Sequence, residues 1–157
     1  GHLCLSTLHA NNAPSTLDRI VNFFPEEARA QLLADLSLNL RAIISQRLVR
    51  DVDNKLVPAV EVMLNTPYIS ELIKEGELGK IQDAMENGGT TGMRTFDQAL
   101  LQLYKEGRIS AERAIEHADS KNNVQLKIKL GGGAPSSSEE GSGKVELRLQ
   151  NQRRQRN

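Results

Sequence analysis

Apolar residues at the start of the chain form a short run and then change to helical spacing. The run over residues 2–8 is mostly apolar, which is typical of a strand covered on both faces of an α/β sheet. Asn12 and Pro14 favour a helix start just after it, because Asn caps a helix N-terminus and Pro fits the first turn. Apolar residues three and four positions apart then extend to Pro25, which stops or kinks the helix. The pattern predicts a buried strand followed at once by a helix.

A second apolar stripe predicts a long helix that begins at about Glu26 and runs on to Arg47. Two further runs, near 47–52 and 56–64, predict the strands of a hairpin with an Asp-Asn pair in its turn. Pro58 lies near the start of the second strand, and it indicates an edge strand or a bulge because it has no backbone N–H to donate.

Residues 66–130 predict a series of short helices. Candidate caps at their starts are Thr66, Thr95, Ser110 and Ser120. Gly76 and Gly107 follow two of the predicted helices, where glycine readily adopts the left-handed conformation that ends a helix. Because the strands come early and small helices follow, the predicted fold class is α/β with a helical appendage.

The composition changes sharply after Leu130. The stretch GGGAPSSSEEGSG lacks large apolar residues and is typical of a flexible linker, and the chain then finishes in the basic string NQRRQRN. We therefore divide the chain into an α/β part (1–66), a helical region (67–130) and a flexible linker with a basic tail (131–157). Truncation after Leu130 is expected to leave the melting temperature nearly unchanged.

Composition and charge exclude several classes of protein. Hydrophobic residues make up 38% of the 157 positions, which is too many for a wholly disordered chain. Twenty basic and twenty acidic residues cancel, and aromatic residues are only 3%, so neither an overall basic field nor a stacking platform predicts specific nucleic-acid binding. Cys4 is the one cysteine, which excludes an intrachain disulfide. No apolar run approaches the ~20 residues that span a bilayer, so the cytoplasm is the expected location.

The first residues also concern whether this chain is a whole protein or part of a longer one. The chain begins with Gly instead of Met, and it begins inside a predicted strand. We therefore expect the chain to be the C-terminal piece of a longer protein.

Polar residues near the start of the chain are candidates for chemistry. His2 and His9 would lie ~20 Å apart if the residues between them are extended, so one zinc ion cannot be bound by both together with Cys4. Ser6 lacks the surrounding glycines of a nucleophile elbow. From the residues alone, a buried strand with polar ends is the favoured interpretation.

The sequence signals for phosphate binding are weaker. The chain has no G-x-x-x-x-G-K-[ST] loop, although polar groups and a helix N-terminus follow the first predicted strand. Four arginines on or beside the first two helices have the fork geometry for a phosphate across a subunit interface: Arg19, Arg41, Arg47 and Arg50. For each of them, a surface charge with an acidic neighbour is the commoner role.

Three segments carry a resemblance to a known family. GHLCLSTLHANNAPSTLDRI resembles the histidine box of RecA-like secretion and pilus ATPases. GMRTFDQALLQLYKEGRISAERAIEHADS resembles the C-terminal region of the type IV pilus retraction ATPases, the PilT/PilU family. NFFPEEARAQLLADLSLNLRAIISQRLV is similar to the same family, and its FFPEE string to the PilU-like branch. The resemblance covers residues 1 to about 130.

The resemblance implies the C-terminal part of a RecA-like P-loop ATPase core, in a hexameric motor that hydrolyses ATP with Mg²⁺ to retract pili. His2 and His9 match the two histidines of the family's box, which are taken to assist hydrolysis or sense the γ-phosphate. Thr7 lies between them in the same box, and Arg19 and Arg47, of the four arginines named above, are further nucleotide-binding candidates. Implied partners are further copies in a homo-hexamer, a sibling retraction ATPase and the inner-membrane pilus platform protein, at the cytoplasmic face of a bacterial inner membrane.

Two departures from the family pattern limit this interpretation. The family's phosphate loop, acidic box and catalytic glutamate precede the histidine box, so this chain alone is expected to be inactive. The retraction motif AIRNLIRE is replaced here by YISELIKE, with Ser70 in place of the first Arg, which fits an accessory, PilU-like motor better. A non-catalytic oligomerisation or interaction module of a pilus or type II secretion system is the alternative function, and a nucleic-acid binder acting through the basic tail is a third.

Overall fold

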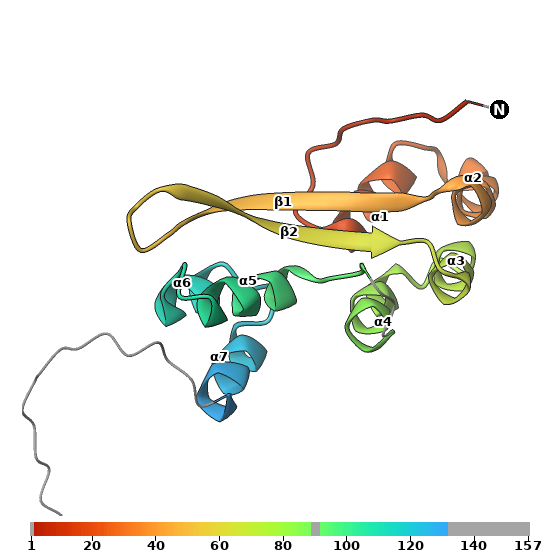
Figure 1. Ribbon diagram of the computed structural model, residues 1–157. Coiled ribbons are helices and arrows are strands. Elements are labelled where there is room, and N and C mark those ends of the chain that lie inside the picture. The colour runs from red at the N-terminus through yellow and green to blue at the C-terminus, as the bar shows by residue number, and fades with distance from the viewer. Residues whose placement is uncertain (1, 89–91, 132–157) are drawn as a thin grey trace, which may run out of the picture.

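The computed structural model describes residues 2–88 and 92–131, and these form one hairpin and a series of helices (Figure 1). In chain order the elements are α1 (Ala13–Asn22), α2 (Glu26–Asn39), β1 (Ala42–Arg50), β2 (Leu56–Leu64), α3 (Pro67–Lys74), the 3-10 turn η1 (Leu78–Lys80), α4 (Ile81–Asn87), α5 (Phe96–Lys105), α6 (Ala111–Glu116) and α7 (Lys121–Leu130). No helix of this described part is long and apolar enough to cross a membrane.

The hairpin confirms the prediction of two antiparallel strands. Ser45 lies opposite Glu61 in its register, and Leu48 lies opposite Pro58. Asn54 in the turn has a φ of 64°, a left-handed conformation that Asn tolerates better than most residues. Pro58 is on an edge, as expected, because the sheet of the described residues has only two strands.

The inner face of the hairpin contributes to two hydrophobic cores. Ile43 and Met63, at one end, pack with α1, α3 and α4, whereas Val49 and Val57, at the other end, pack with α5, α6 and α7. In Figure 1 the two sets of carboxyl-terminal helices lie along the same side of the hairpin, α3 and α4 toward one end, and α5 and α6 toward the other. The polar residues of the inner face therefore lie between two apolar clusters.

Local capping sets most of the helix starts. Asn12 caps α1 by accepting a hydrogen bond from the backbone N–H of Ser15 (3.0 Å). Thr95 forms a capping box with Gln98, and the Thr66 and Ser110 side chains accept bonds in the same manner. Ser120 precedes α7 as expected, but its side chain makes no capping bond. The predicted caps are thus confirmed at four of the five positions.

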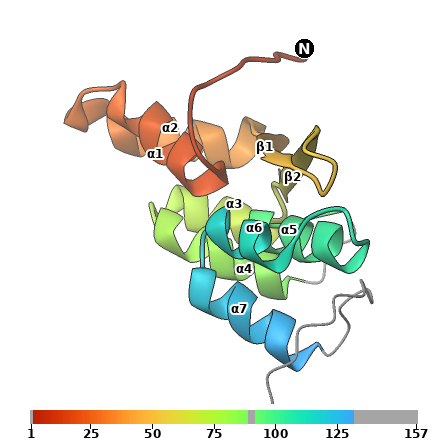
Figure 2. The same ribbon diagram turned by 90° about the vertical axis from the view of Figure 1, so that its left-hand side faces the viewer.

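The segment before α1 differs from the prediction. Residues 2–10 are extended but belong to no strand, and residues 2–9 are exposed. In both views the segment stands apart from the hairpin (Figures 1 and 2). The apolar run over residues 2–8 predicts a buried strand, and this prediction is wrong, because none of the described residues pairs with the run or covers Leu3 and Leu5.

The second helix is shorter than predicted. The stripe from Glu26 predicted a helix to Arg47, but α2 ends at Asn39 and β1 begins at Ala42. Asn65, which directly follows β2, fixes the end of this helix: its Nδ2 donates to the carbonyl of Ser37 (2.9 Å) and to that of the C-cap residue Leu40 (3.0 Å). Because these partners are distant in sequence, the periodicity of α2 could not reveal them.

The region after the hairpin follows the predicted series of short helices, with one interruption. The stretch from Leu78 to Asn87 divides into the short 3-10 turn η1 and the helix α4. The linker and tail fall almost entirely outside the described residues, and the boundaries of the three parts stay predictions.

Candidate functional site

A hollow of about 430 Å³ lies between α1 and the segment that precedes it. Its walls combine residues 9–11 with the side of α1 that faces away from the core. The helix supplies Ser15, Asp18, Arg19, Asn22 and, at its end, Phe23. Ala13 and Leu17, on the opposite side of α1, are fully buried, so the amphipathic spacing of the helix leaves a polar face for the hollow.

Arg19 holds the backbone of His9 at the rim of this hollow. Its Nη1 donates to the His9 carbonyl oxygen at 2.8 Å, while the His9 side chain is exposed. A guanidinium carries five N–H donors, and this bond is the one that Arg19 makes among the described residues. The structure therefore brings two of the predicted site residues together and leaves donors that suit a phosphate or carboxylate.

His2 and Thr7 are not brought into this hollow. Both are exposed on the extended segment that ends at His9, and neither lines the hollow. Among the described residues no group of three or more His, Cys, Asp or Glu side chains lies close enough to hold a metal ion.

Arg47 lies outside the hollow and is bound within the protein. Its Nη2 pairs with Asp119 Oδ1 at 2.6 Å and also donates to the Asn11 carbonyl at 3.1 Å. Its Nη1 donates to the His117 carbonyl at 2.9 Å, and the guanidinium stacks 4.0 Å above the Phe96 ring centroid. These contacts engage both terminal nitrogens of Arg47, so the structure places it as an anchor beside the site.

Glu61 is a buried acid that the sequence reasoning did not single out. It is 0% exposed, and its Oε1 accepts a 2.7 Å hydrogen bond from the backbone N–H of Ala13, at the start of α1. Its Oε2 has no hydrogen-bond partner within the described structure. The alternation along β2 was an available signal, because it puts Glu61 on the same face as the buried Ala59 and Met63.

Burial raises the pKa of the Glu61 carboxyl above its ordinary value of 4.5. The hydrogen bond from the Ala13 N–H opposes the rise in pKa, the negative charge of Asp119 adds to it, and the backbone N–H of Phe96 and the positive charge of Arg47 oppose it. The folded state therefore holds a proton on this group at a pH where the unfolded chain has released it.

Because of this proton, Glu61→Gln is expected to change how the stability of the protein depends on pH. Because the folded pKa is raised, the stabilisation linked to the protonated carboxyl is full below pH 4.5 and is lost as the pH rises through the raised value. Gln keeps an oxygen for the Ala13 N–H but cannot ionise. We expect the melting temperature of the variant, relative to the parent, to rise by a few degrees between pH 4 and pH 8.

The matched control for this prediction is Glu71→Gln, at an exposed position of α3. It should keep the pH dependence of the parent. A constant difference in melting temperature between Glu61→Gln and the parent across this pH range would contradict the buried-proton interpretation.

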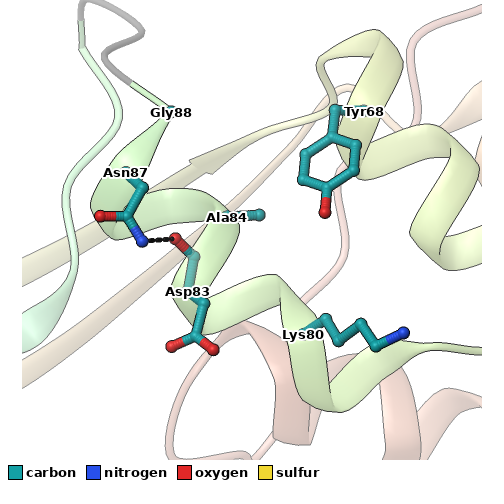
Figure 3. A pocket seen from close by; sticks show the side chains of 6 residues that line it. All are labelled: Tyr68, Lys80, Asp83, Ala84, Asn87 and Gly88. Atoms are coloured by element: carbon teal, nitrogen blue, oxygen red, sulfur yellow. Dashed lines mark hydrogen bonds between the residues drawn. The ribbon is translucent and has the colours of Figure 1, made fainter.

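A second hollow, of about 380 Å³, lies between α3 and α4 (Figure 3). Asn87 Nδ2 donates to the Asp83 carbonyl at 3.0 Å, and the Lys80 ammonium pairs with Glu77 at 3.0 Å. In Figure 3 the Lys80 side chain extends away from Asp83, and the Tyr68 ring lies above the hollow. Its charged groups do not converge, so the hollow beside His9 remains the candidate site.

Comparison with known proteins gives three concordant findings. The family model described as type II/IV secretion system protein matches residues 1–125. The chain is 53% identical over 132 residues to the type IV pilus ATPase PilU of Pseudomonas aeruginosa, a match that covers 83% of this chain and 35% of that protein. It is 40% identical over 123 residues to the type IV pilus retraction ATPase PilT of the same organism, covering 78% of this chain and 36% of that protein.

A solved structure agrees with the sequence matches. The crystal structure of the pilus retraction motor PilT with bound ADP superposes with a TM-score of 0.67 at 34% identity, covering 76% of this chain and 33% of the other. The chain thus spans about a third of the length of the relatives it matches. These findings confirm the resemblance to the pilus retraction ATPases, and the higher identity to PilU agrees with the FFPEE string.

Proposed function

The chain belongs to the type II/IV secretion system protein family, and from this premise we propose that it is the C-terminal part of a RecA-like ATPase that powers type IV pilus retraction. The observation that carries the proposal is the 53% identity to PilU over 83% of the chain. The hollow beside His9 supports it, because most of the residues that line this hollow, His9 and Arg19 among them, belong to the segment that resembles the histidine box.

His9 and Arg19 are the residues of this chain that we propose to act on nucleotide. His9 is exposed at the rim of the hollow, where its imidazole can donate a hydrogen bond to developing charge on phosphoryl oxygens. Arg19 fixes the His9 backbone and keeps further N–H donors for the same purpose. His2 and Thr7 lie on the exposed segment that leads to His9, and we propose that they line the same nucleotide site in the assembled motor.

Binding of ATP and Mg²⁺ requires residues that this chain does not contain. The 157 residues hold no G-x-x-x-x-G-K-[ST] loop, whose backbone N–H groups and Lys bind phosphates. The described residues also form no acidic cluster for a divalent cation. In the proposal, a longer protein supplies these groups, and we refer to that protein as the full-length motor.

Exposed apolar side chains support the idea that more of the ATPase core covers this part. Ile44 is 71% exposed and Leu48 is 52% exposed on the outer face of β1, and Leu56 is 57% exposed at the start of β2. Apolar side chains that share an open sheet face commonly mark an interface. We propose that the rest of the core covers this face.

The partners and the location complete the proposal. We propose a homo-hexamer, associated with a sibling retraction ATPase and the inner-membrane pilus platform protein at the cytoplasmic face of the inner membrane. The solved relative is described as a pilus retraction motor, which supports a mechanical role.

An ATPase assay with two proteins tests the proposed function. The 157-residue chain should release no phosphate from ATP with Mg²⁺, because it lacks the phosphate loop. The full-length motor should release phosphate at an ordinary enzymatic rate, about 1 s⁻¹ or faster. A full-length protein that oligomerises but does not hydrolyse ATP would reject the motor and favour the interaction module.

A further inference from the structure

Three elements bind the short segment that connects His9 to α1. Arg47, on β1, donates to the carbonyl of Asn11 at 3.1 Å. Glu61, on β2, accepts from the backbone N–H of Ala13 at 2.7 Å. Between these two contacts, the Asn12 side chain donates to Asp119 in the α6–α7 connection at 3.3 Å. The backbone two to four residues after His9 is therefore held by both strands of the hairpin and by the C-terminal helices.

The Arg47–Asp119 ion pair is partly shielded from water and is packed against an aromatic ring. Each side chain is 23% exposed, and the bond between Nη2 and Oδ1 is 2.6 Å long. The fully buried ring of Phe96 supports the Arg47 guanidinium from one face. A charge-assisted bond that is partly shielded from water and fixed by stacking is stronger and more directional than an exposed surface pair.

Asp97 links this pair to the helices behind it. Its side chain is almost completely buried at the start of α5, and it accepts from the backbone N–H groups of Asp119 (2.8 Å) and Ser120 (3.0 Å). The position of Asp119 is thus set by α5 and by the start of α7. A continuous set of polar contacts runs from these helices through Asp119 and Arg47 to the segment beside His9.

We propose that Arg47, Asp119 and Glu61 are positioning residues, which fix residues 11–13 and thereby couple the orientation of His9 to the C-terminal helices. The proposal rests on the proposed function, because it assigns these residues a purpose in nucleotide hydrolysis. Arg19 holds His9 from one side and Arg47 holds Asn11 from the other, so loss of either contact frees the short stretch between them.

Hydrogen exchange on the chain itself tests the first half of the proposal. In Asp119→Ala, the amide hydrogen of Ala13, which bonds Glu61, should exchange about tenfold faster than in the parent, because Arg47 and Asn12 both lose a partner that holds this segment. Asp119→Asn keeps an acceptor but loses the charge, and it should fall in between. Asp53→Ala is the control, since it also removes an aspartate side chain, but an exposed one in the hairpin turn. Unchanged exchange in Asp119→Ala overturns the proposal.

Kinetics of the full-length motor test the second half. Asp119→Ala should lower kcat about tenfold with the KM for ATP within twofold, because the group that contacts phosphate is displaced and not removed. Combined with His9→Ala, it should cause no further loss, since both substitutions affect the same group. Losses that multiply, or a kcat that stays at the parental value, overturn the coupling to His9.

These two experiments distinguish failure of the proposed function from failure of the positioning proposal. A parental full-length protein without ATPase activity rejects the motor and the catalytic half of the proposal. The exchange measurement then still decides whether the cluster holds residues 11–13, since it needs no activity.

Discussion

On the proposed function, we expect replacement of His9 by Ala to lower the turnover of the full-length motor by about 10²–10³-fold, the usual cost of losing one preorganised donor to a charged transition state. The structure gives a reason to expect this loss without loss of folding. The His9 side chain is exposed, and the contact that fixes this residue uses its backbone carbonyl, which Ala retains. ATPase rate, nucleotide affinity and melting temperature should be measured on the same preparation.

His117→Ala is the matched control for the His9 substitution. His117 is a half-buried histidine at the end of α6, and it too contacts an arginine through its backbone carbonyl, here Arg47 at 2.9 Å. Its side chain lies outside the hollow, so turnover should stay near the parental rate. His9 is not a catalytic residue if the turnover of His9→Ala stays within about twofold of the parental rate. The same conclusion holds if its melting temperature falls together with its activity.

The elements that the sequence predicted well are those set by neighbouring residues. Asn12, Thr66 and Thr95 cap their helices with bonds to backbone N–H groups three residues away. Gly76 and Gly107 adopt φ values of 74° and 69° just after helices, which a residue with a Cβ rarely adopts. Such signals lie within a few residues of what they determine, so the sequence alone can reveal them.

Long-range contacts explain where the fold prediction was wrong. The break after α2 depends on Asn65, which lies 26 positions beyond Asn39 and bonds the last carbonyls of the helix. The run at residues 2–8 has the composition of a strand, but a strand exists only where another pairs with it, and none of the described residues does. Neither condition is visible in local periodicity.

The residues of the candidate site also divide into those placed by nearby residues and those placed by contacts distant in sequence. His9 and Arg19 are ten positions apart and are brought together by the turn into α1, so the resemblance and the local pattern found both. Arg47 was predicted to bind nucleotide, and the structure instead shows its terminal nitrogens bound to Asp119 and backbone carbonyls; a role toward nucleotide stays untested. Glu61 was missed although the alternation along β2 places it on the buried face, and its partner, the backbone N–H of Ala13, lies 48 positions earlier in the chain.

Phe96→Ala should cause the largest loss of stability, about 3–5 kcal/mol in the free energy of unfolding. Phe96 is fully buried at the start of α5, where it belongs to the core formed with Val49 and Val57 of the hairpin. The substitution removes this packing and also the ring that supports the Arg47 guanidinium. Chemical denaturation of the chain measures the free energy directly.

Phe23→Ala provides the comparison that separates burial from residue type. Phe23 is 65% exposed just after α1, so its removal should cost less than about 0.5 kcal/mol, as for most surface substitutions. Phe96→Leu should recover part of the loss by refilling the core, but it cannot restore the stacking contact with Arg47. Exchange of the Ala13 amide hydrogen should therefore stay faster than in the parent for Phe96→Leu and be unchanged for Phe23→Ala. Equal unfolding free energies for Phe96→Ala and Phe23→Ala would show that the core around α5 does not stabilise this chain.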